Sequence, residues 1–341
     1  MVGSPLVVRA AIPHSICGCS VQSFSSLLSL SILNQSNIAM SRFEELILLY
    51  PSAPWNWALV SLNSSVSFKF ILKHPELPWK PQYVTQNPNV TEQIVRDHLE
   101  YPWDYVGLCS NPNLSMTFYN KFIIKPEEVH RVDWHLLSAH PSIQMSDIIN
   151  NPTYQWDDRY LSANPNITSN FILNEGSQRN WFVPSVCSNP GITARDIFKS
   201  TLKSAFEWDY RNLSANPNLP IAYVHDNMRK DWNFHSISVS ASMNDIAKFR
   251  KIKWDIHGLS MNPNITFEYV KSHPSLDWHK QSLLMNPSID LKTIVDNYSW
   301  WKNINQIERY LSSNPTISLE WIKKNQSKID WSRLSGNTLS V

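Results

Sequence analysis

Glycine is scarce in this chain. Only 7 of the 341 residues are Gly, well below the usual ~7%. Neither GxGxxG nor GxxxxGK[ST], the glycine-rich loops that hold nucleotide phosphates, occurs in the sequence. The HExxH and GxSxG signatures of zinc hydrolases and serine nucleophiles are absent as well. We therefore predict no catalytic, cofactor-binding or metal-binding residues, no cofactor, and a protein that is not an enzyme.

The chain also lacks a strong excess of charge and a long apolar run. Its formal net charge is +2, with 42% hydrophobic and 17% charged residues. This composition can bury a core, and it gives no strong global attraction to nucleic acid. No apolar run approaches the ~20 residues of a membrane-spanning helix. Four cysteines without a framework of pairs suit a reducing compartment. We expect a cytoplasmic protein without a membrane segment, and the sequence argues against secretion.

The first forty residues differ in character from the rest. Residues 1–40 contain no Asp or Glu, a single Arg and many Ser, and ordinary charged sequence begins with MSRFEELILLYPSAPW at Met40. The short apolar stretch at 27–33 is interrupted by Ser, and no clean cleavage site follows it, which disfavours a signal peptide. We expect 1–40 to be a disordered Ser-rich leader, or an extension upstream of a working start, and 41–341 to form a single repeat domain.

A motif with a basic period near 24 residues fills the chain after the leader. LSANPNIT at 161–168 returns as LSANPNL at 213–219 and as LSMNPNIT at 259–266. With the Asn of LSANP as an anchor, twelve positions follow at intervals of 22 to 29 residues and define eleven units. These anchor positions are Asn63, Asn87, Asn111, His140, Asn164, Asn189, Asn216, Ser240, Asn262, Asn286, Asn314 and Asn337.

Residues at fixed distances from the anchor are of one kind. The third residue before the anchor is aliphatic in all twelve cases, the second is nearly always small, and the eighth is Trp in nine. Cys109 and Cys187 occupy the small position, so we expect two buried small residues and no disulfide between them. Such columns indicate that every unit buries the same side chains against its neighbours.

The columns favour helices over strands. A leucine-rich repeat is the alternative, since L-x-x-N resembles its strand, but the fifth residue before the anchor is mostly polar and breaks the required alternation. Apolar residues six and three before the anchor predict a short helix from the Trp to the Ser, often with an Asp beside its start, and Asn-Pro ends it. A second helix follows, with Thr266 as a typical N-cap between Ile265 and Val270. We predict an all-α fold, an α-solenoid of about eleven ~24-residue helix pairs.

The anchor Asn is expected to be structural. An amide side chain carries two donors and an acceptor, so it can satisfy buried backbone groups of both kinds in the turn. A neutral His140 can fill both roles, whereas Ser240 marks a degenerate corner. The histidines His135, His235 and His257 share the fifth position before the anchor and are expected to lie on a solvated or half-buried face.

The repeat motif resembles that of a known protein family. Tandem W…LSxNPNIT repeats occur in proteins of amoeba-infecting giant DNA viruses of the mimivirus type, and the similarity covers nearly the whole repeat region. The resemblance implies a viral origin, with the host-cell cytoplasm as the location, and it implies no particular activity.

Repeats without a catalytic signature predict a scaffold for protein–protein interaction. Stacked end to end, the units would offer a long surface to an extended partner, and extra residues gather before the Trp, especially at 120–133. The alternative is binding of nucleic acid or another polyanion through a mild basic patch at 195–253. Low net charge disfavours nucleic acid, so protein is the expected partner. The cations of the patch are Arg229, Lys230, Lys248, Arg250, Lys251 and Lys253.

Overall fold

The computed structural model describes residues 40–124, 132–199 and 201–339, and this part of the chain is helical without any strand. The all-α prediction is confirmed, and the leucine-rich alternative is wrong because it needs a strand in every unit. The leader expected at 1–40 lies outside the described residues except for Met40. Within the extra segment at 120–133, residues 125–131 lie outside them as well.

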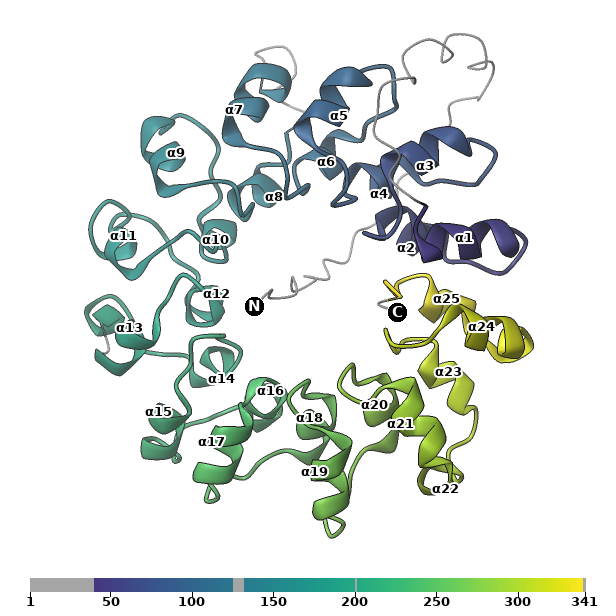
Figure 1. Ribbon diagram of the computed structural model, residues 1–341. Helices are drawn as coiled ribbons and strands as arrows, with labels where there is room; N and C mark the ends of the chain where they lie inside the picture. The colour runs from purple at the N-terminus through teal and green to yellow at the C-terminus, as the bar shows by residue number, and fades with distance from the viewer. Residues whose placement is uncertain (1–39, 125–131, 200, 340–341) are drawn as a thin grey trace. The chain divides into compact units, whose positions relative to one another are not determined.

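The helices alternate between an inner and an outer row (Figure 1). The inner helices are α2 (Trp57–Leu62), α4 (Pro81–Thr85), α6 (Tyr105–Leu108), α8 (Trp134–Ser138), α10 (Asp158–Leu161), α12 (Val183–Ser188), α14 (Tyr210–Leu213), α16 (Phe234–Ser240), α18 (Ile256–Met261), α20 (Lys280–Met285), α23 (Ile307–Leu311) and α25 (Trp331–Leu334). The outer helices are α1 (Arg42–Leu49), α3 (Phe68–Lys73), α5 (Glu92–Asp97), α7 (Met116–Phe118), α9 (Met145–Asn150), α11 (Ser169–Leu173), α13 (Ala194–Lys199), α15 (Ile221–Asp226), α17 (Met243–Lys248), α19 (Phe267–Ser272), α21 (Leu291–Asp296) and α24 (Leu319–Asn325).

Each outer helix and the inner helix that follows it form one repeat, which gives twelve pairs within residues 40–339. The first pair begins with α1 and ends just before the first anchor. The eleven intervals between anchors therefore do not include this pair. Longer repeats place their extra residues between the outer and the inner helix, as the sequence predicts. There the structure has η2 (Tyr119–Ile123), η4 (Thr201–Ser204) and α22 (Tyr298–Trp301); η5 (Gln326–Lys328) lies at the same place in a repeat that is not lengthened.

Most inner helices begin directly after a polar N-cap, seven positions before the anchor. Asp104, for example, accepts a hydrogen bond from the N–H of Gly107. Six of the Asp residues expected beside the helix start are such caps. Asp231 and Asp277 are not, because they stand two residues before the capping residues of their helices. The Trp lies just before the cap, so the prediction that the helix starts at the Trp is wrong by two residues.

In six repeats the Trp side chain ties the inner helix to the outer helix before it, whereas the Nε1 groups of Trp208 and Trp254 have no acceptor. In the six, Nε1 donates to the carbonyl of the residue that ends that outer helix, as from Trp79 to His74 at 2.8 Å and from Trp278 to His273 at 3.0 Å. A buried indole thus brings a large apolar surface to the core and satisfies a free carbonyl at a helix end. Four further residues make the same bond: Trp55, Trp103, Trp156 and Trp232.

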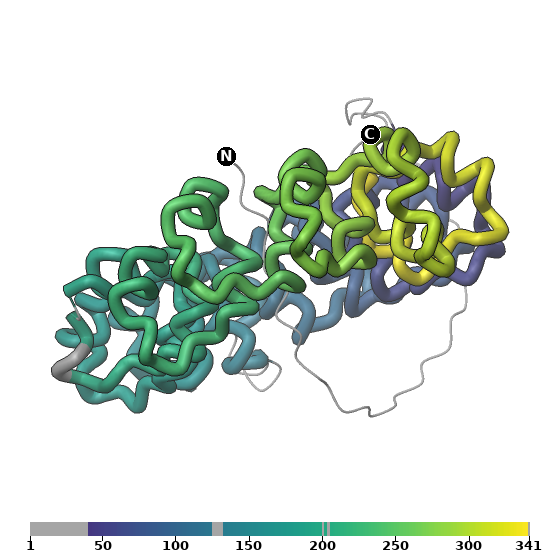
Figure 2. Tube along the Cα trace, turned by 90° about the horizontal axis from the view of Figure 1, so that it is seen from below, coloured from purple at the N-terminus to yellow at the C-terminus, as the bar shows by residue number. Residues whose placement is uncertain are grey.

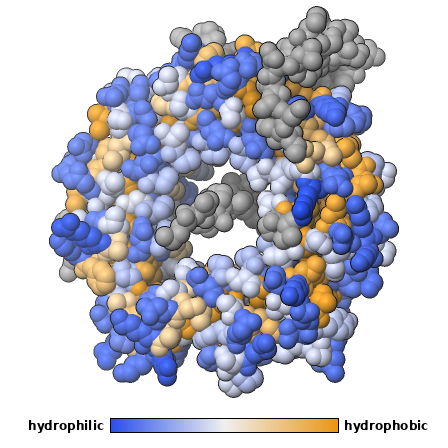
Figure 3. All heavy atoms as spheres, in the orientation of Figure 1, coloured by the Kyte–Doolittle hydropathy of each residue, from blue (hydrophilic) through white to orange (hydrophobic). Residues whose placement is uncertain are grey.

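The outer helices begin as the motif predicts. Thr266 accepts a hydrogen bond from the N–H of Tyr269, and Ile265 and Val270 are both buried on either side of that cap. This pairing of apolar residues across the N-cap fixes the direction in which the chain enters the helix. Viewed from below, consecutive pairs lie side by side along the chain (Figure 2), while hydrophilic residues cover much of the face seen in Figure 3, with apolar residues between them.

The anchor Asn joins neighbouring corners, a corner being the segment between an inner helix and the next outer helix. The Nδ2 group of Asn164 donates to the carbonyls of Ser138 at 2.9 Å and His140 at 3.0 Å in the preceding corner. Its Oδ1 accepts the N–H of Asn166 at 2.9 Å. Ten anchors donate in this way to the carbonyl two residues before the preceding anchor position: Asn63, Asn87, Asn111, Asn164, Asn189, Asn216, Asn262, Asn286, Asn314 and Asn337.

The small residue two before the anchor also bonds the next repeat. The hydroxyl of Ser138 accepts a hydrogen bond from the backbone N–H of Asp157 at 2.9 Å, and Asp157 is the N-cap of the following inner helix. At the same position the sulfur of Cys187 accepts the N–H of Asp209 at 3.4 Å. The sequence indicates that this position needs a small side chain. The structure adds that the side chain also accepts a hydrogen bond from the next repeat.

The last repeat contacts the first as any repeat contacts its neighbour. The Nδ2 group of Asn63 donates to the carbonyls of Ser335 at 3.0 Å and Asn337 at 2.9 Å. The rings of Trp55 and Trp331 lie 4.9 Å apart. Both views show the beginning of the array, with α1, next to its end, with α25 (Figures 1 and 2). Within residues 40–339 the array is therefore closed, and the long surface expected for an extended partner stays a prediction.

The corner after α16 is shorter than the others. Ser260, which accepts the next cap, and Thr266, which caps the next outer helix, are six residues apart in a regular corner; the equivalent Ser238 and Ser242 are four apart. Ser240 belongs to the last turn of α16 and is not an anchor. The described residues show no side-chain amide in this corner, in agreement with the expectation that it is degenerate.

Replacing Asn164 with Ala should lower the free energy of unfolding by ~1–3 kcal/mol, because buried carbonyls lose their donor. Asn63→Ala should cost a similar amount, since Asn63 makes the same bonds between the last and first repeats. Chemical denaturation of both variants measures this. If Asn164→Ala is costly while Asn63→Ala changes stability by less than about 0.3 kcal/mol, a shift within ordinary error of such comparisons, the array is open in solution.

Candidate functional site

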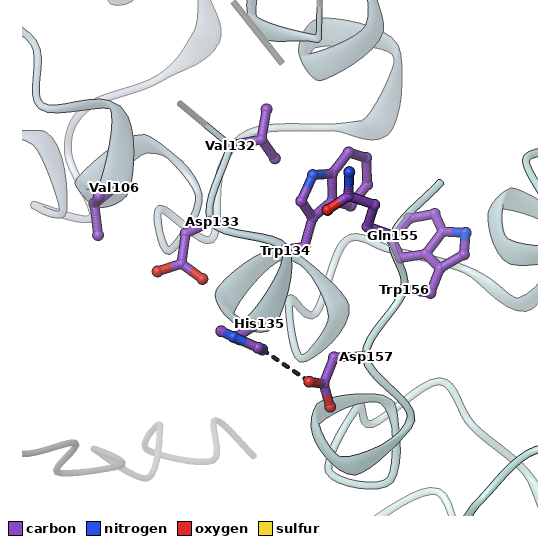
Figure 4. Close-up of a pocket in the computed structure, with 8 residues that line it drawn as sticks. All are labelled: Val106, Val132, Asp133, Trp134, His135, Gln155, Trp156 and Asp157. Atoms are coloured by element: carbon purple, nitrogen blue, oxygen red, sulfur yellow. Dashed lines mark hydrogen bonds and ion pairs between the residues drawn. The ribbon is translucent and has the colours of Figure 1, made fainter. Parts of the chain in front are cut away.

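A hollow of about 580 Å³ lies at the starts of α8 and α10, and we call it the α8–α10 hollow. Figure 4 shows the residues that line it: Val106, Val132, Asp133, Trp134, His135, Gln155, Trp156 and Asp157. Nothing in the repeat motif marks these residues as a group.

Two helix caps supply the charges of this hollow. One oxygen of Asp133 accepts the N–H of Leu136 at 3.0 Å, which holds the carboxylate at the start of α8. Asp157 caps α10 with its Oδ1, while its Oδ2 lies 2.8 Å from Nδ1 of His135 (Figure 4). The carboxylates are therefore held in place by the same bonds that start the helices, and their negative charges remain at the edge of the hollow.

An indole N–H without an acceptor adds to the hollow. Trp134 is 8% exposed, and its Nε1 is buried without a hydrogen-bond partner. Trp134 is the first residue of α8, two positions later than the usual Trp, whose place is taken by Val132. It does not make the bond to the preceding outer helix that Trp156 makes to Asn151 at 2.9 Å, and neither do Trp208 and Trp254, which stand at the usual position.

Other hollows differ in their lining. One of about 400 Å³ at the starts of α4 and α6 includes Lys80, Trp103 and Asp104. Another of about 510 Å³, beside α11 and α12, includes Arg179 and Phe206. The hollows thus recur along the array, but the charge that they present changes from repeat to repeat.

The predicted basic patch is exposed at the turns after α15 and α17. Arg229 and Lys230 follow α15, and Lys248 to Lys253 end α17 and follow it, in consecutive repeats. The ring of His225 lies 5.3 Å from that of Phe249, which connects the two turns. All six patch cations are exposed, and within the described part of the chain none forms an ion pair.

The histidine column connects neighbouring inner helices. Nδ1 of His235 lies 2.8 Å from Oδ1 of Asp255, in the same relation as His135 has to Asp157. The rings of His257 and His279 lie 4.3 Å apart. Among the residues that the structure describes, no group of three or more His, Cys, Asp or Glu side chains could hold a metal ion. The two buried cysteines, Cys109 and Cys187, are free thiols, as expected.

Comparison with known proteins returned no match: no family model, no curated protein and no solved structure is similar to this chain. In the described ranges no helix has the length and apolar character needed to cross a bilayer. The function must therefore be argued from the geometry alone.

His140 replaces an anchor Asn with a titratable group. Its Nε2 lies 2.6 Å from the carbonyl of Asn111, and its Nδ1 accepts the N–H of Ser142 at 3.1 Å. The neutral ring thus donates on one side and accepts on the other, as a carboxamide does. Burial lowers the pKa of His140, because a charged ring would lose its hydration there, and the hydrogen bond to the carbonyl of Asn111 only opposes this shift.

The free energy of unfolding should therefore fall as the pH falls below ~6.5, the pKa of an unfolded His. In that range the unfolded chain binds a proton that folded His140 does not bind, so stability rises with pH until the unfolded His is neutral. His140→Asn should reduce this slope, because Asn makes the same bonds at other corners and does not titrate.

Urea denaturation between about pH 5 and about pH 8 measures the slope. His279→Asn is the companion variant, because burial and the neighbouring His257 also lower the pKa of His279. An unchanged slope in His140→Asn would contradict the role assigned to the neutral ring.

Proposed function

We propose that this chain is a non-enzymatic scaffold that binds protein through the starts and exposed faces of its inner helices. The supporting observation is the contrast between buried and exposed columns. The ten anchor Asn residues are at most 6% exposed. The fifth residue before the anchor is Val106, His135, Arg159 and Arg211 in four repeats, and all four are exposed. A variable surface on a constant frame is how repeat proteins bind partners.

The buried side chains whose pKa values are shifted have structural roles. Burial raises the pKa of Cys109 and of Cys187 to about 11, so at neutral pH both are protonated and poor nucleophiles. The hydroxyl of Tyr119 donates to the carbonyl of Leu108 at 2.8 Å, and His140 completes a corner. We therefore propose no catalytic role for these residues.

The resemblance of the repeat words to those of amoeba-infecting giant viruses supports a viral origin for this chain. On that proposal, the scaffold acts in the cytoplasm of the host cell and its partner is a viral or host protein.

Photo-crosslinking tests the scaffold proposal. A benzoylphenylalanine placed at Met261 of inner helix α18, which is 43% exposed, should crosslink to a partner protein in an amoebal lysate. The matched control is Val295 of outer helix α21, which is 57% exposed. Mass spectrometry of the crosslinked bands identifies what each position contacts. Equal recovery from both positions, or none from Met261, would count against binding at the inner helices.

Polyanion binding is a second candidate, favoured by the six exposed and unpaired cations of the patch. The side chains of Lys230 and Lys248 lie over the rings of Tyr210 and Phe249 at 5.0 and 5.1 Å. Aromatic surfaces beneath cations hold the charges at the protein surface without neutralising them. Phosphate groups of a polyanion would meet several cations across two neighbouring turns.

Binding of RNA or DNA through the patch should weaken steeply with added salt, because phosphate contacts release counterions. Changing Arg250, Lys251 and Lys253 to Glu should abolish it at low salt in a filter or fluorescence assay. The same change of net charge at Lys69, Lys73 and Lys292, which are exposed elsewhere, should leave most of the binding. If both triple variants lose binding equally, net charge and not the patch is responsible.

A further inference from the structure

A histidine caps α20, whereas most other inner helices of the described ranges are capped by Asp or Asn. We propose that the contacts of this residue, His279, with α18 and α20 form a pH-sensitive switch. The switch is closed while the His279 ring is neutral, and it opens when the ring takes up a proton. The proposal concerns the repeat frame itself, so it does not depend on which partner the chain binds.

The N-cap acceptor of α20 is a ring nitrogen. Nδ1 of His279 accepts a hydrogen bond from the backbone N–H of Ser282 at 3.3 Å, and it lies 2.8 Å from the hydroxyl oxygen of Ser282. The backbone N–H of His279 donates to Oγ of Ser260 at 3.0 Å, which holds the residue against the last turn of α18. An acceptor at Nδ1 requires the neutral ring with its proton on Nε2. Only one protonation state of His279 therefore caps α20.

Protonation would convert this acceptor into a donor. Both nitrogens of an imidazolium carry hydrogen, so Nδ1–H would face the backbone N–H of Ser282. The hydroxyl of Ser282 can turn and accept a hydrogen bond from Nδ1, but the backbone N–H is fixed and would lose its partner. Ser282 is 3% exposed, so water does not readily replace that partner. A helix of six residues has few bonds of its own and depends on this cap.

A second histidine ring lies against the cap. The ring centroids of His257 and His279 are 4.3 Å apart, and those of His235 and His257 are 5.3 Å apart. The three rings follow one another along neighbouring helices α16, α18 and α20 (Figure 1). His257 and His279 are exposed, so protons reach both rings. Two imidazolium charges at this spacing repel each other, so protonation of both rings would push α18 and α20 apart. Burial and the neighbouring His257 lower the pKa of His279.

The other charged groups on the neighbouring inner helices are engaged elsewhere. Asp255, the N-cap of α18, lies 2.8 Å from Nδ1 of His235. Nζ of Lys280, the first residue of α20, donates to the carbonyl of Trp300 at 2.8 Å. The charged residues of α23 form ion pairs with the last repeat, Glu308 with Lys328 and Arg309 with Asp330. His257 is therefore the titratable group that acts on His279.

Hydrogen exchange at the capped amide tests the switch. Below pH ~6.5, the pKa of an unperturbed His, the opened form binds a proton that the closed form does not, so opening becomes easier as the pH falls. The reporter is the N–H of Ser282 in the ¹⁵N-labelled full chain, corrected for the intrinsic exchange rate. Its protection should fall about three-fold or more between about pH 7.5 and about pH 5.5. The N–H of Ser236, which donates to the Asn233 cap of α16 at 3.2 Å, is the matched control and should keep its protection.

Two variants separate the switch from the fold. Asn56 and Asn233 cap α2 and α16 at the same position of the repeat, so His279→Asn should fold normally. This variant should protect the N–H of Ser282 equally at both pH values, because Asn does not titrate. His257→Gln should keep the cap of α20 but reduce the pH dependence, because the repulsion between the two rings is gone.

A loss of protection at low pH that survives in His279→Asn would overturn the proposal, as would equal losses at Ser282 and Ser236 in the unmodified chain. The tautomer gives an independent check. In a long-range ¹H–¹⁵N spectrum at neutral pH, Nδ1 of His279 should be the nitrogen without a proton, and a proton there would contradict the assigned cap. These results do not bear on crosslinking at Met261, so the scaffold proposal stands or fails separately.

Discussion

A side-chain amide at the exit of ten of the twelve inner helices of residues 40–339 holds neighbouring repeats together. Asn164 illustrates why the residue must be Asn: its Nδ2 serves two carbonyls of the preceding corner while its Oδ1 accepts an N–H of its own. Asp would lack the donor and bring a charge into a site with no exposure, and Ser would not span the distance. The helices have only three to eight residues within this part of the chain, too few to be stable alone, so these joints are what makes them persist.

Much of the frame could be predicted from the sequence because it depends on local chemistry repeated many times. A cap such as Thr266 and its apolar pair lie within one segment, and Asn-Pro ends a helix wherever it occurs. The role of Ser138 as an acceptor for Asp157 joins residues 19 apart and cannot be read from a column of small residues. Closure of the array depends on residues still farther apart in the sequence, since Asn63 donates to the carbonyl of Ser335, 272 positions away. Closure also depends on the small rotations between neighbouring repeats, which add up over the whole array.

The α8–α10 hollow escaped the sequence for a different reason. Trp134 is a buried ring at the start of α8, two residues after the place of the regular Trp. Its Nε1 has no acceptor, but the same is true of Trp208 and Trp254 at the regular position, so an unpaired indole does not mark this repeat. The basic patch, in contrast, could be predicted because its cations follow each other closely in the chain.

Closure explains why the first and last repeats keep the same apolar residues as the others. The end repeats of an open array need a polar outer face for solubility. Here Trp55, Trp331 and Leu334 are each at most 9% exposed, and the aliphatic counterparts of Leu334 in internal repeats are buried as well. The hydroxyl of Ser335 receives the N–H of Asn56 at 2.9 Å, just as an internal Ser receives the next cap. An opened array would expose these side chains and leave the groups unpaired at both ends, so the closed form is stabilised by the very contacts that elsewhere join one repeat to the next.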